Sequence, residues 1–226
     1  MWITDGPSMN REQLLAQLAS MILSIQQPHP IRVAVDGIDA AGKTTLADEL
    51  AARIETRRRA VLRASLDGFH HPRAMRYRRG RHSPEGYYYD SFNYTALKDS
   101  LLLPLGPGGD RRCRLGIFDF RTDSPVNPSF HDAPADAVLL FDGVFLQRPE
   151  LNPHWDYRIF LEVDFNVGLQ RALQRDGSHF TSNQAILERY EGRYFPGQCI
   201  YLQTVRPQQY AHVLIDNNDP GDPFFL

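Results

Sequence analysis

The sequence predicts one α/β domain with a mainly parallel, doubly wound sheet of five strands and helices on both faces. Three observations lead to this prediction. Short apolar runs alternate along the chain with longer stretches of helical spacing. A glycine-rich loop joins the first apolar run to a helical stretch. The length of 226 residues, with 42% hydrophobic and 23% charged side chains, suits one domain covering residues 1–226.

Apolar residues at helical spacing mark six segments. The first, residues 8–27, carries Leu14, Leu18 and Ile22 on one face and is expected to be an amphipathic leader helix. The second, at residues 43–55, contains neither glycine nor proline. The remaining helices are expected at residues 92–103, 166–174, 184–194 and 200–205.

Apolar runs bounded by turn-forming residues predict the strands. They lie at residues 31–35, 60–66, 137–141, 157–163 and 213–215, and residues 115–120 are a further candidate. Residues 70–90 are rich in arginine, proline and glycine, so we expect a substrate-side loop or small insertion there. Ligands of a doubly wound sheet bind beyond the carboxyl ends of its strands.

Composition excludes several classes of protein. The 25 Lys and Arg against 27 Asp and Glu give a net charge of −2, which attracts neither nucleic acid nor an anionic membrane. Cys113 and Cys199 are too few for a disulfide framework or a four-thiolate zinc site. The start of the chain lacks signal-peptide features, and no apolar run reaches the length of a membrane span. We therefore expect a cytoplasmic protein without nucleic-acid or membrane partners.

The strongest motif is G-x-x-x-x-G-K-[ST] at residues 37–44, the phosphate-binding loop of P-loop NTPases, which lies here between a strand and a helix. Its glycines let backbone N–H groups surround phosphates at a helix N-terminus. Lys43, one of only two lysines in the chain, would reach the β- and γ-phosphates, and Thr44 would hold a bridging Mg²⁺. The predicted ATP-binding residues are Gly37, Ile38, Asp39, Ala40, Ala41, Gly42, Lys43, Thr44 and Thr45.

Two other nucleotide-binding classes fit less well. A dinucleotide fold needs glycine at the third loop position, where this chain has Asp39. A GTPase needs an N-K-x-D motif, and neither Lys43 nor Lys98 lies in one.

Acidic residues end two of the predicted strands. Asp142 follows the apolar run 137–141 and would orient Mg²⁺ directly or through water. Asp67 follows residues 60–66, which puts it near the γ-phosphate end of the loop. A carboxylate there could orient or deprotonate an attacking hydroxyl. Each Asp alone is equally well interpreted as a strand-end turn, and the phosphate loop is what favours the catalytic interpretation.

The order of the motifs resembles the uridine kinase and phosphoribulokinase family of small-molecule kinases, with pantothenate kinase as a relative. The resemblance runs from about Ile31 to Asn217. It includes the phosphate loop, S-L-D-G-F-H at residues 65–70, I-F-D-F at residues 117–120 and F-D-G at residues 141–143. It implies that the chain transfers the γ-phosphoryl group of ATP to a small-molecule hydroxyl, foremost the 5′-hydroxyl of uridine or cytidine.

The resemblance also assigns roles to residues. Asp67 corresponds to the catalytic base, and Arg171 and Arg175 to arginines that fold over the transferring phosphoryl group. Residues 177–184 correspond to a small lid that excludes water. Lys43 and Asp142 complete the predicted catalytic set, with Thr44 and Asp142 as metal ligands. The predicted substrate-binding residues are Asp67, His70, Glu85, Asp90, Phe118, Asp119 and Asp123.

Several positions depart from the family pattern and leave the acceptor open. Phe118 and Asp123 stand where uridine kinases use a tyrosine and a histidine to read the pyrimidine, and Glu85 rivals Asp90 as the ligand of sugar hydroxyls. Phe118 has no hydroxyl, and ionised Asp123 can only accept hydrogen bonds. Where the family tends to read R-R-x-x-R-D, Ala172 replaces one arginine.

The alternative acceptor is pantothenate or another small hydroxy acid or sugar. Five arginines between Arg73 and Arg81 would bind its carboxylate, although a solvated loop or an RNA contact also fits them. A non-catalytic nucleotide-binding module is the alternative from another class. The sequence leaves the choice between ATP and GTP, and the formation of homo-oligomers, open.

Overall fold

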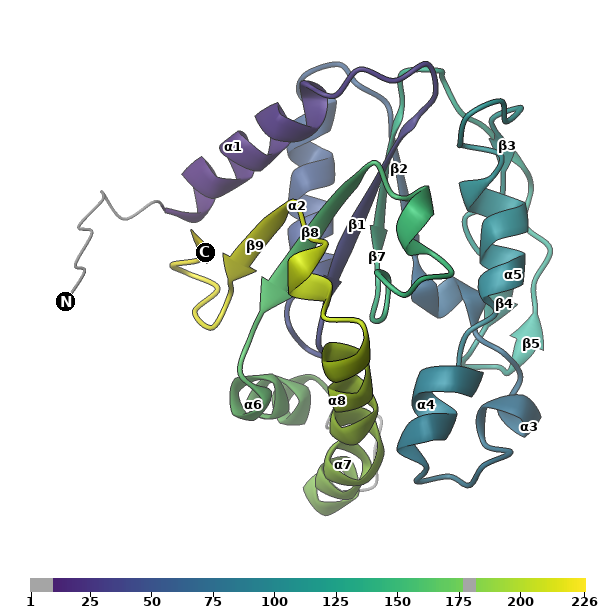
Figure 1. Cartoon of the computed structure of the whole chain (residues 1–226), viewed down its shortest axis with the longest axis vertical. Coiled ribbons are helices and arrows are strands. Elements are labelled where there is room, and N and C mark those ends of the chain that lie inside the picture. The colour runs from purple at the N-terminus through teal and green to yellow at the C-terminus, as the bar shows by residue number, and fades with distance from the viewer. Residues whose placement is uncertain (1–9, 177–181) are drawn as a thin grey trace.

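The computed structural model describes residues 10–176 and 182–226, and its centre is a six-stranded sheet (Figure 1). The strand order is β10-β9-β8-β1-β7-β2. The bounds are β1 Ile31–Gly37, β2 Val61–Ser65, β7 Val138–Asp142, β8 Tyr157–Glu162, β9 Val213–Asp216 and β10 Phe224–Phe225. The first five are parallel where they pair, and β10 is antiparallel to β9.

The α/β class and the five parallel strands are confirmed, but the sheet has one strand more than predicted. The additional strand, β10, has only two residues, too few to produce an alternating pattern. The candidate strand at residues 115–120 does not belong to this sheet. Within it, β4 (Phe118–Asp119) pairs with β5 (Ser124–Pro125) in a separate hairpin. A further hairpin joins β3 (Arg112–Cys113) to β6 (His131–Asp132).

Side chains alternate along the central strands and form a hydrophobic core on each face of the sheet. On one face, Val33, Leu140 and Ile159 pack with the helices α1 (Arg11–Leu23) and α2 (Lys43–Glu55). On the other face, Leu139, Phe141 and Phe160 belong to the second core. That core includes residues from α4 (Pro84–Asp90), α5 (Tyr94–Leu97) and α8 (Phe195–Thr204). The near-complete burial of β1 and β7 is typical of a parallel sheet covered on both faces.

The predicted helices exist, with different ends. Asn10 caps α1, and Asn93 caps α5, which continues as a π-helical turn at Lys98–Leu102. The helix predicted at 184–194 is α7 (Asn183–Arg189) and a π-helical segment, Tyr190–Tyr194, that runs directly into α8. The remaining helices are α3 (Arg73–Arg76) and α6 (Phe165–Asp176). No helix in the described part of the chain is long and apolar enough to cross a membrane.

Strand register aligns the ends of three strands. Asp142 is paired with Val35 of β1 on one side and with Ser65 of β2 on the other. The chain therefore leaves β1, β2 and β7 at the same edge of the sheet. This edge carries the phosphate loop, the Leu66–Phe69 turn and Gly143.

Arg193, in the π-helical segment Tyr190–Tyr194, is hydrogen-bonded to the substrate-side segment at residues 70–90. The side chain is 1% exposed and donates hydrogen bonds to the carbonyl oxygens of Ser83 (2.9 Å) and Arg76 (3.0 Å). Its guanidinium lies 4.9 Å from the centre of the Tyr77 ring. One buried cation thus satisfies carbonyls of α3 and of the turn before α4.

We expect Arg193→Met to lower the melting temperature by about 5–10 °C, because buried carbonyl groups would lose their donor, at about 1–3 kcal/mol per unsatisfied group. Arg112→Met is the control, since Arg112 is exposed and stacks on Phe130 at the surface. Equal melting temperatures for the two variants, measured by circular dichroism, would contradict this role of Arg193.

Candidate active site

The phosphate loop joins β1 to α2, and its two glycines are required by close contacts. Gly37 and Gly42 have φ angles of 149° and 92°. A Cβ atom on Gly37 would come 2.8 Å from the carbonyl oxygen of Leu161, and one on Gly42 would come 2.7 Å from Nδ2 of Asn217. Asn217 in turn donates to the carbonyl oxygen of Ala41 at 2.6 Å. The loop is therefore held between β8 and the chain that leaves β9.

Lys43 and Thr44 lie at the start of α2. The Lys43 ammonium donates to the carbonyl oxygen of Ile38 at 2.6 Å, so it lies within the curve of the loop. Burial lowers the pKa of Lys43, while the carboxylates of Asp39 and Asp36 act in the opposite direction. Thr44 is exposed, and so is Thr45 in the same first turn. The backbone N–H groups of a first helical turn have no partners within their helix, which suits them to phosphate oxygens.

Asp142 ends β7 directly beside the phosphate loop. Its Oδ2 accepts a hydrogen bond from Thr44 Oγ1 at 2.7 Å. Its Oδ1 accepts one from Arg63 Nη2 at 2.9 Å. The predicted pair of metal ligands, Thr44 and Asp142, is therefore in direct contact. Among the described residues, no group of three or more His, Cys, Asp or Glu side chains is arranged to hold a metal ion by itself.

Asp67 lies on the 3₁₀ turn that follows β2, with its side chain exposed. Desolvation is the first cause that raises the pKa of Asp67, and the negative charge of Asp142 raises it further. The positive charges of Lys43 and Arg175 oppose this shift. The carboxylate thus interacts with the phosphate loop, with β7 and with α6.

His70 supports the Asp67 turn. Its Nδ1 lies 3.0 Å from the carbonyl oxygen of Asp67, which can only accept, so Nδ1 carries the proton. Burial lowers the pKa of His70 to about 4, and the ring is therefore neutral at pH 7. Its ring centre lies 4.5 Å from that of Phe92 and 5.2 Å from that of Phe120. His70 accordingly presents a neutral aromatic surface beside Asp67.

The two predicted phosphoryl-binding arginines point in different directions. Arg175 donates to the Tyr190 hydroxyl at 3.2 Å, and its charge acts on Asp67. Arg171 donates to the carbonyl oxygens of Asn217 and Asn218 at 2.8 and 2.9 Å. Arg175 is therefore close enough to Asp67 to act on its carboxylate, whereas Arg171 is hydrogen-bonded to the chain that follows β9. Most of the predicted lid, residues 177–181, lies outside the described residues, and Ser182 caps α7.

Asp90 is fully engaged by arginines. It is 1% exposed, and its two oxygens accept hydrogen bonds from Arg78 Nη2 at 2.5 Å and Arg79 Nε at 2.7 Å. Burial alone would raise the pKa of Asp90, but the bonds from the two arginines outweigh it and lower the pKa. A role for Asp90 in holding sugar hydroxyls would require these ion pairs to open.

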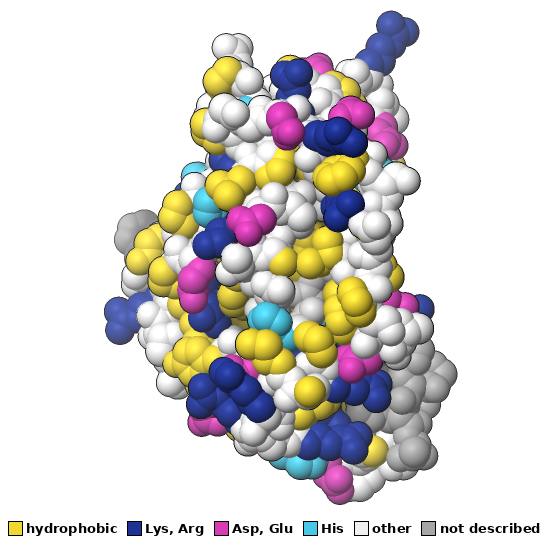
Figure 2. Space-filling model, turned by 90° about the vertical axis from the view of Figure 1, so that its right-hand side faces the viewer, with side chains coloured by type: hydrophobic (Ala, Val, Ile, Leu, Met, Phe, Trp, Pro, Cys, Tyr) yellow, Lys and Arg dark blue, Asp and Glu magenta, His cyan; other side chains and the backbone are white. Residues whose placement is uncertain are grey.

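Asp123 is engaged in a similar way. Its Oδ1 accepts from Arg76 Nη2 at 2.8 Å and from the backbone N–H of Arg73 at 3.0 Å. Three side chains of the Arg73–Arg81 run are therefore paired with carboxylates, the Arg76 side chain buried and those of Arg78 and Arg79 half-exposed. Figure 2 shows basic side chains toward the lower end of this face, the region of α3 and α4, where the basic residues of the sequence are arginines.

The other predicted acceptor residues have local structural contacts. Glu85 is exposed in the first turn of α4 and accepts from Ser83 Oγ at 3.0 Å. Phe118 is buried in β4, while Asp119 accepts from Arg121 N at 2.9 Å and closes the β4–β5 turn. The segment at residues 117–120 nevertheless lies next to Asp67, because the backbone N–H of Ile117 donates a hydrogen bond to the carbonyl oxygen of Gly68 at 2.9 Å.

Sequence analysis missed the contacts of the phosphate loop with α4 and α8. Asp39 Oδ2 accepts from the Tyr87 hydroxyl at 2.9 Å and from Gln198 Nε2 at 2.5 Å. Asp36, fully buried before the loop, accepts a short hydrogen bond from the Tyr201 hydroxyl, and burial is the main cause that raises its pKa to about 6. These partners are remote in sequence and belong to no motif, so no local signal identifies them.

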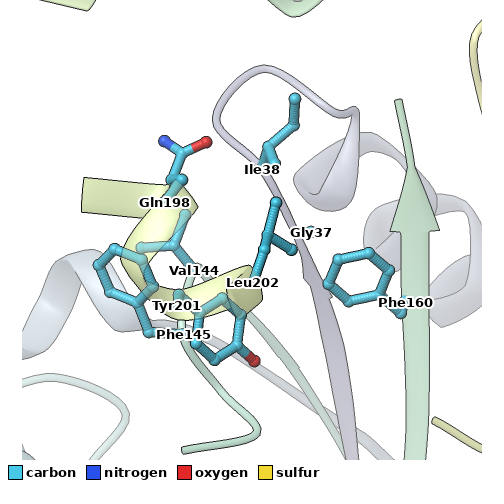
Figure 3. Close-up of a pocket in the computed structure, with 8 residues that line it drawn as sticks. All are labelled: Gly37, Ile38, Val144, Phe145, Phe160, Gln198, Tyr201 and Leu202. Atoms are coloured by element: carbon cyan, nitrogen blue, oxygen red, sulfur yellow. The ribbon is translucent and has the colours of Figure 1, made fainter. Parts of the chain in front are cut away.

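Figure 3 shows how closely α8 approaches the base of the loop. Gln198, Tyr201 and Leu202 of α8 surround a small cavity together with Gly37 and Ile38 of the loop. The cavity is too small to hold a water molecule. The helix therefore supports the loop by direct packing, and the cavity is not a ligand site.

Comparison with known proteins agrees with this geometry. Residues 32–219 match the model of the Phosphoribulokinase / Uridine kinase family. Uridine-cytidine kinase B of Dictyostelium discoideum is 29% identical over 189 residues, which are 83% of this chain and 74% of that protein. Uridine kinase of Lactobacillus helveticus is 24% identical over 202 residues, 85% of this chain and 89% of that protein.

Two solved structures have similar folds. A possible uridine kinase from Bacillus stearothermophilus has a TM-score of 0.70 and 24% identity, with 90% of this chain and 97% of that chain covered. A putative fructose transport system kinase from Silicibacter sp. TM1040 has a TM-score of 0.69 and 25% identity, with 84% and 94% covered.

The family match covers the phosphate loop, Asp67, Asp142 and both α6 arginines. It favours an enzyme over a non-catalytic nucleotide-binding module, and the use of ATP follows from the kinase family. The chain is therefore a phosphotransferase that belongs to the phosphoribulokinase / uridine kinase family.

Proposed function

We propose that this enzyme transfers the γ-phosphoryl group of ATP to the 5′-hydroxyl of a ribonucleoside such as uridine or cytidine. The observation that carries the proposal is the convergence of Lys43, Asp142 and Asp67 at one edge of the sheet. The names of the relatives, uridine kinase and uridine-cytidine kinase, support the choice of acceptor.

The chemistry follows from the charges of the site. The loop N–H groups and Lys43 would bind the phosphates of ATP, and Arg175 would neutralise charge that develops on the transferring group. The acceptor hydroxyl would give its proton to the Asp67 carboxylate while its oxygen forms the new bond to the γ-phosphorus. The bond from the γ-phosphorus to the bridging oxygen breaks, and ADP leaves with that electron pair. A raised pKa makes Asp67 a better proton acceptor than an ordinary carboxylate.

The residues at the loop fit a magnesium ion. Thr44 Oγ1 and Asp142 Oδ2 are oxygen donors 2.7 Å apart, and Mg²⁺ prefers oxygen ligands. Such an ion is usually held by one or two protein groups together with substrate phosphates, which agrees with the absence of a larger metal cluster among the described residues. When bound, the ion would supply positive charge that offsets the charge of the phosphates.

A sugar is the second candidate acceptor, and a hydroxy acid is less well supported. Phe118 is buried and lacks a hydroxyl, and Asp123 is paired with Arg76, so neither is available to read a pyrimidine as the family residues do. The solved structure of similar fold that is named a putative fructose transport system kinase supports a sugar as this candidate. The pairing of Arg76, Arg78 and Arg79 with carboxylates leaves fewer cations of the Arg73–Arg81 run for the carboxylate of a hydroxy acid.

The acceptor is identified by measuring ADP release at saturating ATP and Mg²⁺ with uridine, cytidine, fructose, glycerate and pantothenate. Mass spectrometry then locates the added phosphate. We expect the highest kcat/KM with uridine or cytidine and 5′-phosphorylated products. Turnover of fructose or pantothenate alone would overturn the nucleoside assignment, and ADP release without a phosphorylated acceptor would contradict the transfer reaction.

Lys43→Ala should reduce turnover at least about 100-fold, because the phosphates lose their charged donor. Lys98→Ala is the matched control, since Lys98 is the only other lysine and lies on the π-helical turn after α5. Both variants are assayed for ADP release and melting temperature. Retention of normal turnover by Lys43→Ala would show that the loop does not bind the reacting phosphates.

Asp67→Asn should lower kcat about 10²–10⁴-fold, the usual contribution of a general base, with little change in melting temperature because the side chain is exposed. In the wild type, kcat/KM should fall as the pH drops through the raised pKa of Asp67, where the base becomes protonated. Asp99→Asn, a change of an exposed carboxylate, is the control. Parallel loss of stability and activity in Asp67→Asn would indicate a structural turn instead.

A further inference from the structure

The phosphate loop carries a carboxylate of its own at Asp39. Loops of this kind attract anions through backbone N–H groups, so a negative charge within one opposes their main function. Asp39 is nevertheless held in place by two side chains. The Tyr87 hydroxyl and Gln198 Nε2 both donate to its Oδ2, at 2.9 and 2.5 Å.

The partners of Asp39 show which way its carboxylate faces. Tyr87 belongs to α4, part of the substrate-side segment, and Gln198 belongs to α8. Gln198 also accepts from the backbone N–H of Asp39 at 3.2 Å, so one amide holds both the backbone and the side chain. Gly197 permits this arrangement, since a Cβ atom there would come 2.8 Å from the Tyr87 ring. Asp39 therefore lies where the phosphate loop, α4 and α8 meet.

The charged groups that act on Asp39 are the ones assigned above to phosphoryl transfer. The positive charges of Lys43 and Arg175 act on its carboxylate, and so does the negative charge of Asp67. Burial is the first cause acting on the Asp39 carboxylate and raises its pKa, whereas the charge of Lys43 and the hydrogen bond from Tyr87 lower it and favour the ionised form. An acceptor that approaches Asp67 would therefore meet a second carboxylate, in addition to the phosphates of ATP.

Three arginines of the substrate-side segment already have carboxylate partners. Arg76 is paired with Asp123, and Arg78 and Arg79 are paired with Asp90. A negatively charged acceptor would be repelled by Asp39 and Asp67 without gaining these arginines as partners. An uncharged acceptor avoids the repulsion.

We propose that Asp39 is a specificity-determining residue whose carboxylate selects uncharged hydroxyl acceptors and rejects anionic ones, such as hydroxy acids and sugar phosphates. This inference rests on the proposed function, because it assumes that an acceptor binds next to Asp67. It adds the chemical class of that acceptor and gives the reason for an acidic residue in the loop.

Asp39→Asn isolates the charge. Both donors bond the same oxygen, Oδ2, so the amide oxygen of asparagine can accept the same two hydrogen bonds. Asp39→Ser is a second uncharged variant in case the first does not fold. Tyr87→Phe is the matched control, because it removes one hydrogen bond and leaves the charge. Melting temperatures establish that each variant is folded.

The assay compares acceptors that differ in charge on one skeleton: uridine with its carboxylated analogue orotidine, and panthenol with pantothenate. The wild type should prefer the neutral member of each pair that it turns over. Asp39→Asn or Asp39→Ser should reduce this preference, as a ratio of kcat/KM values, by about 10-fold or more, the size expected for one like charge at short range. Tyr87→Phe should keep the ratio within about 2-fold of wild type.

Each contrary result has a separate meaning. A wild-type preference for the anionic members, or an unchanged ratio in the uncharged variants, would overturn the role of Asp39 while leaving the kinase assignment intact. A reduced ratio in Tyr87→Phe equal to that in Asp39→Asn would also overturn it, since hydrogen bonding would then explain the selectivity. Failure of the wild type to phosphorylate any acceptor would contradict the proposed function itself.

Discussion

The parallel pairing of β7 with β1 and β2 is the constraint on which the site depends. Because Asp142 is in register with both Val35 and Ser65, the three strands end at one level of the sheet. A shift of one residue would turn the side chain of Asp142 to the other face of the sheet and away from Thr44. The hydrophobic cores on both faces fix this register, so burial far from the site determines where its charged groups lie.

The second general feature is the concentration of carboxylates around the loop. Asp36, Asp39 and Asp67 all have raised pKa values, with desolvation as the first cause in each case. Hydrogen bonds from Tyr201, Tyr87 and Gln198 hold two of these carboxylates in place. The same bonds connect the loop to α8 and α4. The electrostatics of the site and its mechanical support therefore come from the same contacts.

Sequence reasoning predicted the parts of the molecule that depend on local order. The β1–loop–α2 unit follows from an apolar run, two glycines and a helical stretch, and Asp142 follows from the most apolar run of the chain. It did not predict the pairing of Asp90 with Arg78 and Arg79, although these residues are close in sequence, because arginine can equally face solvent. The contact of Asp39 with Gln198 spans 159 positions and depends on how α8 packs.

A crystal structure with a non-hydrolysable ATP analogue and uridine tests the convergence of these strand ends most directly. It should contain the triphosphate in the loop at residues 37–44, with the γ-phosphate toward Asp67. The acceptor hydroxyl should lie between Asp67 and the γ-phosphorus, with about 3–3.5 Å between the reacting atoms. A nucleotide bound away from the loop, or an acceptor hydroxyl remote from Asp67, would contradict this account.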